Sequence, residues 1–447
     1  MPDLNAAVAA VMPSVHRDLE ALVRIESVSA DPARHAQVRE SAATTAELFG
    51  VEGFEVEIVS AEGGLPAVIA RKPAPTGAPT VLLYAHHDVQ PEGDHDAWVS
   101  PPFEPTRRQS RLFGRGAADD KAGIAAHLAA VRAHGDSLPV GVTVFVEGEE
   151  EIGSPSLDRL LSDHRDKLES DVIVIADSTN WNIGTPALTT SLRGLVDCVV
   201  EVRTLDHAVH SGMWGGVVPD AVTALCRLIA TLHDDQGNVA VAGLAASAAA
   251  DLTYPEDRLR AEAGVSVGVQ LIGSGSLVDR LWTRPAIAVI GFDATRIADA
   301  SNTLLPVARA KISLRISPSD DAEEAFVKLR DHLTSHAPWG AQVSVTAGDL
   351  GRPFAIDAEG PAYDAARAAF REAWDGTAPV DIGVGGSIPF IAEFADMFPA
   401  ASILVTGVED PDTRAHGANE GLHVAEFERV CLAEALLLER LARLGDR

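Results

Sequence analysis

The sequence predicts an α/β domain with a mainly parallel central sheet flanked by helices, interrupted by an inserted α+β domain with an antiparallel sheet. Short apolar runs alternate with segments of helical periodicity over residues 1–188, the pattern of strands buried on both faces. Strict alternation of apolar and polar residues replaces this pattern over residues 189–352, which is typical of half-exposed antiparallel strands. The first pattern returns over residues 353–447, so we expect these residues to complete the first domain.

The first domain is expected to begin with helices and to continue with strand–helix–strand units. A glycine-containing turn leads into a predicted helix over residues 119–134, whose first turn is acidic, as the helix dipole favours. Units of this kind build a mainly parallel sheet. The other elements expected here are helices over residues 12–25 and 37–49, and strands over residues 80–88, 142–150 and 171–177.

The same patterns assign helices and strands in the inserted domain and in the C-terminal segment. In the insert, the patterns predict strands over residues 195–204, 310–318 and 341–349, and helices over residues 219–233 and 322–333. In the C-terminal segment, they predict a helix over residues 361–374, a strand over 402–410 and a final amphipathic helix over 426–441.

Length and composition limit the number of domains and the classes of function that the chain can have. A chain of 447 residues exceeds one ordinary core, so two domains are expected. The formal net charge of −29 disfavours binding to nucleic acids or to anionic membranes, because both require a basic surface. The chain shows neither a stretch apolar enough for a membrane helix nor the basic and apolar regions of a signal peptide. We therefore predict a soluble cytoplasmic protein.

The cysteines agree with that location. Cys198, Cys226 and Cys431 are widely spaced and form no CxxC motif, which fits a reducing compartment rather than a disulfide framework. We expect all three to be buried and to pack as small hydrophobic residues.

Clusters of metal-ligand side chains follow several of the predicted strands. Ligands in open α/β sheets gather beyond the carboxyl ends of the strands, so residues distant in sequence can build one site there. Carboxylates mixed with two or three imidazoles suit a pair of hydrolytic divalent ions, most often zinc. Taken singly, each cluster also fits a surface turn, a helix cap or a solvated charged face. The clusters are His86-His87-Asp88, Asp119-Asp120, Glu149-Glu150-Glu151, Asp177 and His416.

Residue type and spacing suggest tasks for some of these side chains. His86 and Asp88 point to the same side of an extended segment, so Asp88 could fix the orientation of the imidazole. One carboxylate at the turn before residue 121 could bridge two metals. The three consecutive acids could place a metal ligand beside a general base, because a cation relieves the repulsion between them.

The motifs, in this order along the chain, make it resemble a known family. They are LLYAHHDVQP, LFGRGAADDKAG, EGEEEIGSPSL, VIAD, PALTTSLRG, HAVHSGMWGG, NTLLP, GGSIPF and AHGANE. The chain is similar to the co-catalytic di-zinc metallopeptidases, which include carnosinases, cytosolic non-specific dipeptidases, aminoacylases, succinyl-diaminopimelate desuccinylase and carboxypeptidase G. The motifs EGEEEIGSP, HSGMWGG and GGSIP bring it nearest to the dipeptidase branch.

The resemblance implies a role for each site residue in a zinc-peptidase catalytic domain. One zinc would be held by His86 and Asp177, and the other by Glu151 and His416. Asp119 would bridge both ions and precede a cis peptide bond. Glu150 would act as the general base, with Asp88 as the partner of His86.

The resemblance also implies that the insert is a lid and dimerisation domain, so we expect a homodimer through it. His210 would stabilise the oxyanion, in dimeric relatives from the partner subunit. Asn302 and Arg315 would bind substrate, with Arg315 suited to a carboxylate. Gly386 and Ser387 would lie near the substrate backbone.

Two positions depart from the family pattern. Val384 stands where dipeptidase relatives usually carry a Glu that helps to hold the free amine of the substrate. His87 stands where relatives often have Tyr or Thr. The first departure leaves open whether the substrate is a free-amine dipeptide or an N-acyl amino acid.

The function expected from all of this is metal-dependent hydrolysis of an amide bond in dipeptides or small peptides. Two zinc ions per chain would activate the water, with manganese or cobalt as alternatives. The nearest alternative is an aminoacylase or another amidohydrolase of N-acyl or N-carbamoyl amino acids. A remote alternative is a non-catalytic relative that binds metal or peptide. Serine hydrolase chemistry is disfavoured because the chain has no GxSxG motif.

Overall fold

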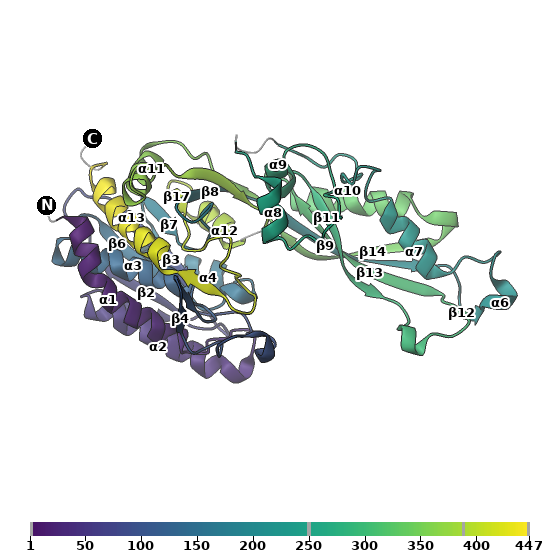
Figure 1. Cartoon of the computed structure of the whole chain (residues 1–447), viewed down its shortest axis with the longest axis horizontal. Helices are drawn as coiled ribbons and strands as arrows, with labels where there is room; N and C mark the ends of the chain where they lie inside the picture. Colours follow the sequence, from purple (N-terminus) through teal and green to yellow (C-terminus); the bar gives the residue numbers. More distant parts are fainter. Residues whose placement is uncertain (1–2, 248–251, 387–388, 445–447) are drawn as a thin grey trace. The chain divides into compact units, whose positions relative to one another are not determined.

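The structure, a computed structural model, describes residues 3–247, 252–386 and 389–444. The chain divides into two compact units (Figure 1). The first consists of Met1–Thr190, Ile356–Ile382 and Glu393–Arg447, and the second of Ser191–Ala355 and Gly383–Ala392.

The first unit contains most of a mixed sheet with a parallel centre. The strands follow the order β1-β2-β6-β3-β7-β17-β8-β15, and β16 also pairs with β8. Neighbours from β6 to β17 run parallel, whereas β1, β2 and β8 pair antiparallel with their neighbours. The bounds are β1 Glu55–Val59, β2 Ala67–Lys72, β3 Thr80–His86, β6 Gly141–Glu147, β7 Val172–Ile175, β8 Ala187–Leu192, β15 Phe354–Ala355, β16 Val380–Val384 and β17 Ser402–Val405.

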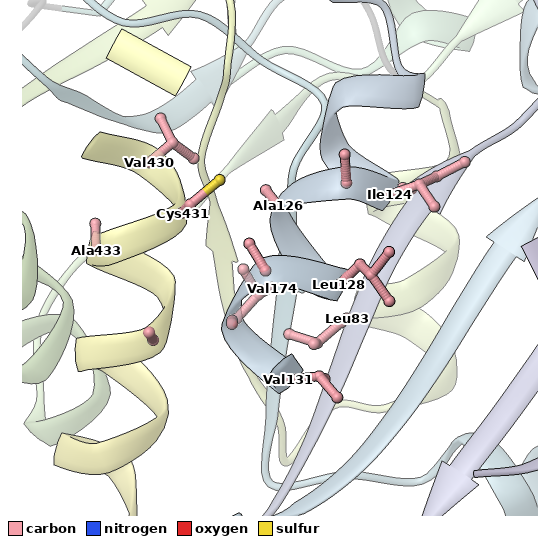
Figure 2. Packing of buried hydrophobic residues seen from close by; sticks show 14 of the residues in the cluster. Leu83, Ile124, Ala126, Leu128, Val131, Val174, Val430, Cys431 and Ala433 are labelled. Carbon is pink, nitrogen blue, oxygen red and sulfur yellow. The ribbon is translucent and has the colours of Figure 1, made fainter. Parts of the chain in front are cut away.

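Helix α3 lies at the centre of the first core. Its small residues, among them Ala126, allow close packing, and Leu128 and Val131 gather with Leu83 of β3 and Val174 of β7 (Figure 2). Helices α1 and α13 also contact α3. The helices are α1 Leu4–Val23, α2 His35–Val51, α3 Lys121–His134, α4 Leu157–Asp163, α5 Arg165–Leu168, α11 Pro361–Ala373, α12 Pro389–Met397 and α13 Val424–Ala442.

A small three-stranded sheet joins the C-terminal segment to the loop before α3. Its order is β18-β5-β4, with β4 Thr106–Arg108, β5 Arg111–Phe113 and β18 Gly421–His423. Gly421 of β18 pairs with Phe113 of β5. The loop before β18 is therefore held beside the loop that leads into α3.

The second unit contains a four-stranded antiparallel sheet covered on one face by two helices. Alternate residues of its strands, such as Val200 and Ile312, are buried against Leu225 of α7 and Leu329 of α10. The order is β11-β13-β9-β14, with β9 Gly194–Arg203, β11 Ala286–Asp293, β13 Val307–Ile316 and β14 Gln342–Gly351. The helices are α6 Ser211–Trp214, α7 Ala221–Ala230, α8 Glu256–Glu262, α9 Leu277–Trp282 and α10 Ala322–Ser335, and β10 Val209–His210 pairs with β12 Thr303–Leu304.

The predicted fold class is confirmed in both parts, namely the mainly parallel sheet with helices and the separate antiparallel sheet. Among the described residues, no helix combines the length and the apolar character that crossing a bilayer requires. The cysteine expectation is wrong at one position. Cys198 and Cys431 are buried, but Cys226 is exposed because it lies on the outer side of α7.

Candidate metal centre

Three central strands of the first unit bring their carboxyl ends together at this site. His86 is the last residue of β3 and lies opposite Glu147, the last residue of β6. The three consecutive acids follow β6 directly, and Asp177 lies two residues beyond the end of β7. Because these strands are parallel neighbours, side chains that follow them meet at one edge of the sheet.

A first group of ligand atoms surrounds the ring of His86. Its Nε2 atom lies 3.2 Å from Asp119 Oδ1, 3.9 Å from Glu150 Oε2 and 4.0 Å from Asp177 Oδ2. Ligand atoms of His86, Glu150 and Asp177 all lie within 4.8 Å of one another. This separation is short enough for one divalent ion to contact all three side chains.

A second group shares Asp119 with the first. Ligand atoms of His86, Asp119 and Glu151 also lie within 4.8 Å of one another. The Nε2 atom of His416 lies 3.0 Å from Asp119 Oδ2 and 3.4 Å from Glu151 Oε2. The two oxygens of Asp119 thus face two different imidazoles. The Asp119–Asp120 peptide bond is cis, as the resemblance implied.

Asp88 contacts both the imidazole and the backbone of the acidic run. Its Oδ1 atom lies 3.5 Å from His86 Nδ1, which is also 3.1 Å from the backbone oxygen of Asp88. The carboxylate accepts hydrogen bonds from the backbone nitrogens of Glu150 and Glu151, at 3.3 and 3.1 Å. Burial alone would raise the pKa of Asp88, but the contact with His86 outweighs it and holds that pKa below its usual value.

The three consecutive acids face different neighbours. Glu149 accepts a hydrogen bond from the backbone nitrogen of Leu65 at 2.7 Å and another from the Ser156 hydroxyl, so it belongs to the loop and not to the ligand groups. Glu150 faces His86, as described above. Glu151 faces His416 and accepts hydrogen bonds from Gln90 N at 2.9 Å and from Gln90 Nε2 at 2.7 Å.

The site concentrates negative charge away from water. Burial, together with nearby carboxylates, raises the pKa of Asp177 to about 6 and that of Glu151 to about 9. Burial also raises the pKa of Glu150 well above its usual value, against the opposing charge of His86. Burial would likewise raise the pKa of Asp119, but hydrogen bonds with His416 and His86 hold it well below the usual value.

These residues fit divalent cations. A cation is the natural partner for several acids crowded together and shielded from solvent. The donor set of carboxylate oxygens and imidazole nitrogens suits zinc, and also manganese or cobalt.

The second imidazole of the first cluster lies outside the ligand groups. His87 is fully buried, and its Nε2 atom lies 2.8 Å from the backbone oxygen of Pro66. Burial lowers the pKa of His87 to about 4, so the ring is neutral at physiological pH. The ring that faces Asp119 is that of His86.

The remaining predicted site residues belong to the second unit. His210 is exposed, and its Nδ1 atom accepts a hydrogen bond from Gly212 N at 3.0 Å. The backbone oxygen of Asn302 accepts a hydrogen bond from Ser211 N at 2.9 Å, so His210 and Asn302 lie near each other. Arg315 lies near the end of β13, opposite Leu195 of β9. Gly386 is half-buried, and Ser387 lies outside the described residues.

Sequence reasoning missed the half-buried Gln90 and the buried Glu420, which hold these ligands. Gln90 binds Glu151 through both its backbone and its amide, and Glu420 accepts hydrogen bonds from the backbone nitrogens of Ala118 and Asp119. The only sequence signal was that both residues lie inside the motifs quoted for the resemblance. Motif membership does not reveal partners that are distant in sequence.

Comparisons with known proteins agree with the geometry. A model of peptidase family M20/M25/M40 matches residues 82–440. The Cysteinylglycine-S-conjugate dipeptidase of Corynebacterium striatum is 35% identical over 432 residues, which cover 95% of this chain and 94% of the relative. The Cys-Gly metallodipeptidase DUG1 of Candida albicans is 28% identical, with 92% of this chain and 91% of the relative covered.

A solved structure shares the fold. The crystal structure of human carnosine dipeptidase 1 is similar with a TM-score of 0.82 at 23% identity, and 98% of each chain is covered.

Proposed function

The chain belongs to peptidase family M20/M25/M40 and is a metallodipeptidase, and on this premise we propose that two divalent ions, zinc in the first instance, occupy the centre around Asp119. The expected resemblance to this family and its dipeptidase branch is confirmed. The observation that carries the proposal is Asp119, whose two oxygens face His86 and His416 separately. That arrangement is the one required of a carboxylate that bridges two ions.

In this proposal, the ligands divide between two positions. His86 and Asp177 hold one ion, Glu151 and His416 hold the other, and Asp119 contacts both. Asp88 orients the ring of His86 through its Nδ1 atom. When bound, the ions would lower the pKa of a water molecule and polarise the carbonyl of the scissile bond.

Glu150 is proposed as the general base. Its side chain is 19% exposed, so a water molecule can reach the carboxylate. Among the described residues no hydrogen bond engages that carboxylate, in contrast to those of Glu149 and Glu151. A carboxylate left available at this position can take a proton from the attacking water and return it to the leaving amine.

The distance that separates Arg315 from His210 and Asn302 within one chain supports a homodimer. Val307 and Arg315 lie on one continuous strand, β13, and a rise of ~3.4 Å per residue separates them by about 27 Å. Strand β12 ends shortly before β13 begins and pairs with β10, so His210 and Asn302 lie near the Val307 end of β13. A dipeptide extends over only ~7 Å, so one substrate cannot contact both groups of the same chain.

We therefore propose that the insert mediates a homodimer in which His210 and Asn302 serve the partner's substrate. His210 would donate to the oxyanion, and Arg315 of the other chain would bind a carboxylate. Gly386 and Ser387 are proposed to lie along the substrate backbone.

The proposed substrates are dipeptides with a free amine, such as those named for the relatives, cysteinylglycine and β-alanyl-histidine. Val384 is the observation that favours a second candidate, an N-acyl amino acid, because an apolar side chain at that position cannot pair with an ammonium group. The proposed location remains the cytoplasm.

A paired substrate panel separates the two candidates. The protein would be freed of metal, reloaded with zinc, manganese or cobalt, and assayed on Cys-Gly, β-Ala-His and their N-acetylated forms. Hydrolysis of the free dipeptides alone is the expected result. Turnover confined to the N-acetylated compounds would overturn the dipeptide assignment and favour the second candidate.

A further inference from the structure

Glu420 is a fully buried acid that lies four residues after His416. We propose that Glu420 is a positioning residue that fixes the backbone of Asp119 relative to His416, so that both ligands present their atoms to the same pair of ions. The inference rests on the proposed function in taking these two residues as ligands. It concerns a side chain that contacts neither ion nor substrate.

The carboxylate of Glu420 accepts four hydrogen bonds from the loop that carries Asp119. Its Oε1 atom accepts from Ala118 N at 2.9 Å and from Asp119 N at 3.1 Å. Its Oε2 atom accepts from Gly116 N at 3.0 Å and from Arg115 Nη1 at 2.6 Å. The loop before α3 is therefore held through its backbone, including the nitrogen of Asp119 itself.

Arg115, which pairs with Glu420, also binds the loop that carries His416. Its Nη2 atom donates to the backbone oxygens of Gly417, next to His416, at 3.3 Å, and of Pro91 at 3.4 Å. The guanidinium also lies 5.6 Å from the ring centroid of Trp98. A buried ion pair depends on additional hydrogen bonds to its two partners. Here those bonds join three separate loops.

The loop of His416 needs such support. Arg414, His416 and Asn419 have φ angles of 59°, 62° and 63°, a left-handed conformation that is unfavourable for residues other than glycine. The side chain of His416 is 60% exposed, so packing around the ring does not fix it. The loop is held instead by the hydrogen bond that Gly417 O accepts from Arg115 Nη2 and by those between Asn419 and the backbone of Ala97 and Val99.

Small changes at Glu420 would disturb this arrangement in defined ways. Glu420→Gln keeps the size of the side chain but replaces one acceptor oxygen with an NH₂ group, which cannot accept from the backbone nitrogens or from Arg115. Glu420→Asp keeps the charge but is one methylene shorter, so it cannot reach all four donors together.

The test measures metal affinity separately from catalysis. Wild type, Glu420→Gln and Glu420→Asp would be freed of metal and titrated with zinc against a competing chelator. We expect both variants to bind zinc about 10–100-fold more weakly, the range found when groups that orient metal ligands are removed. At saturating zinc, the KM for a dipeptide should stay near the wild-type value, because Glu420 does not contact the substrate.

Glu434→Gln is a matched control, since Glu434 is a buried acid that pairs with His127 and lies away from the ligand loops. The Glu434→Gln substitution should lower thermal stability and leave zinc affinity unchanged.

Wild-type zinc affinity in either folded Glu420 variant would overturn the inference. If Glu420→Gln does not fold, Glu420→Asp decides alone. Absence of dipeptide hydrolysis by the wild type would count against the proposed function and leave the zinc comparison valid.

Discussion

At the scale of single residues, neighbouring carboxylates differ because they face different partners. Glu149 is engaged by Leu65 and Ser156, whereas the carboxylate of its neighbour Glu150 remains accessible to water beside His86. Chemical type alone therefore does not assign a role within the acidic run.

Glu150→Ala tests the proposed base. A positioned general base contributes about 10²–10⁴-fold to rate, so kcat should fall by that factor or more. Bound metal should persist, because His86, Asp119, Asp177, Glu151 and His416 remain. Steady-state kinetics and metal analysis of the purified variant measure both quantities.

Glu149→Gln is the matched control for that experiment. It changes the adjacent acid, whose carboxylate binds Leu65 N, and should keep most of the activity. Full activity in a metal-loaded Glu150→Ala variant would show that another group accepts the proton.

The pattern of strands and charges was sufficient to nominate the candidate ligands, whereas their division between two ions came only from the family resemblance. His86 ends the apolar strand β3 and Asp177 lies two residues beyond β7, and the rule that ligands gather at strand ends identifies such residues without a structure. Residue type and spacing alone could not divide the acidic run, because the partners Leu65, Gln90 and Ser156 come from other loops; only the family resemblance assigned Glu150 and Glu151 separate roles.

At the scale of elements, α3 is fixed to its neighbours by a polar contact inside the core. The Nδ1 atom of His127 lies 2.8 Å from Glu434 Oε1 of α13, and its Nε2 atom lies 3.0 Å from the backbone oxygen of Tyr84 of β3. Both ring nitrogens thus face acceptors, an arrangement that suits the protonated imidazole.

This contact predicts a pH dependence of stability. Burial opposes the charged ring, but Glu434 outweighs it and raises the pKa of His127 above its usual value. A raised folded-state pKa contributes stability that is fully present below the unfolded value of about 6.5 and is lost as pH rises through the folded value. The difference in unfolding free energy between wild type and Glu434→Gln should therefore be larger at pH 6 than at pH 9. Chemical denaturation at both values measures it, and an equal or reversed difference would contradict the assignment.

Elements with strong patterns were predictable, and short edge strands were not. The buried strands β3, β6 and β7 appear where uninterrupted apolar runs predicted them. Strand β1 lies at the edge of the sheet and alternates charged with apolar residues, and the apolar run of β2 spans only four residues, 67–70, before two charged ones. Their pairing depends on the neighbouring strand β6, a long-range contact that no local pattern records.

At the scale of the whole molecule, the proposed homodimer predicts subunit complementation. Glu150→Ala and His210→Ala chains should each be inactive as homodimers. If His210 serves the partner's substrate, each mixed dimer contains one intact site, and random mixing should restore about a quarter of wild-type activity. Mixing after dissociation, with sedimentation to confirm the dimer, checks this. If His210 instead acts on its own chain's substrate, every chain in a mixed dimer lacks one of the two residues and the mixture stays inactive. Inactivity of confirmed mixed dimers would therefore contradict the proposal.

The central claim is a pair of ions at Asp119 that enables dipeptide hydrolysis. Its most direct test is a zinc titration of the metal-free protein, in which bound zinc and hydrolysis of Cys-Gly are followed together. The predicted result is that activity is absent without metal and reaches its plateau at about two ions per chain. Dipeptide hydrolysis that persists after complete removal of metal would contradict the claim.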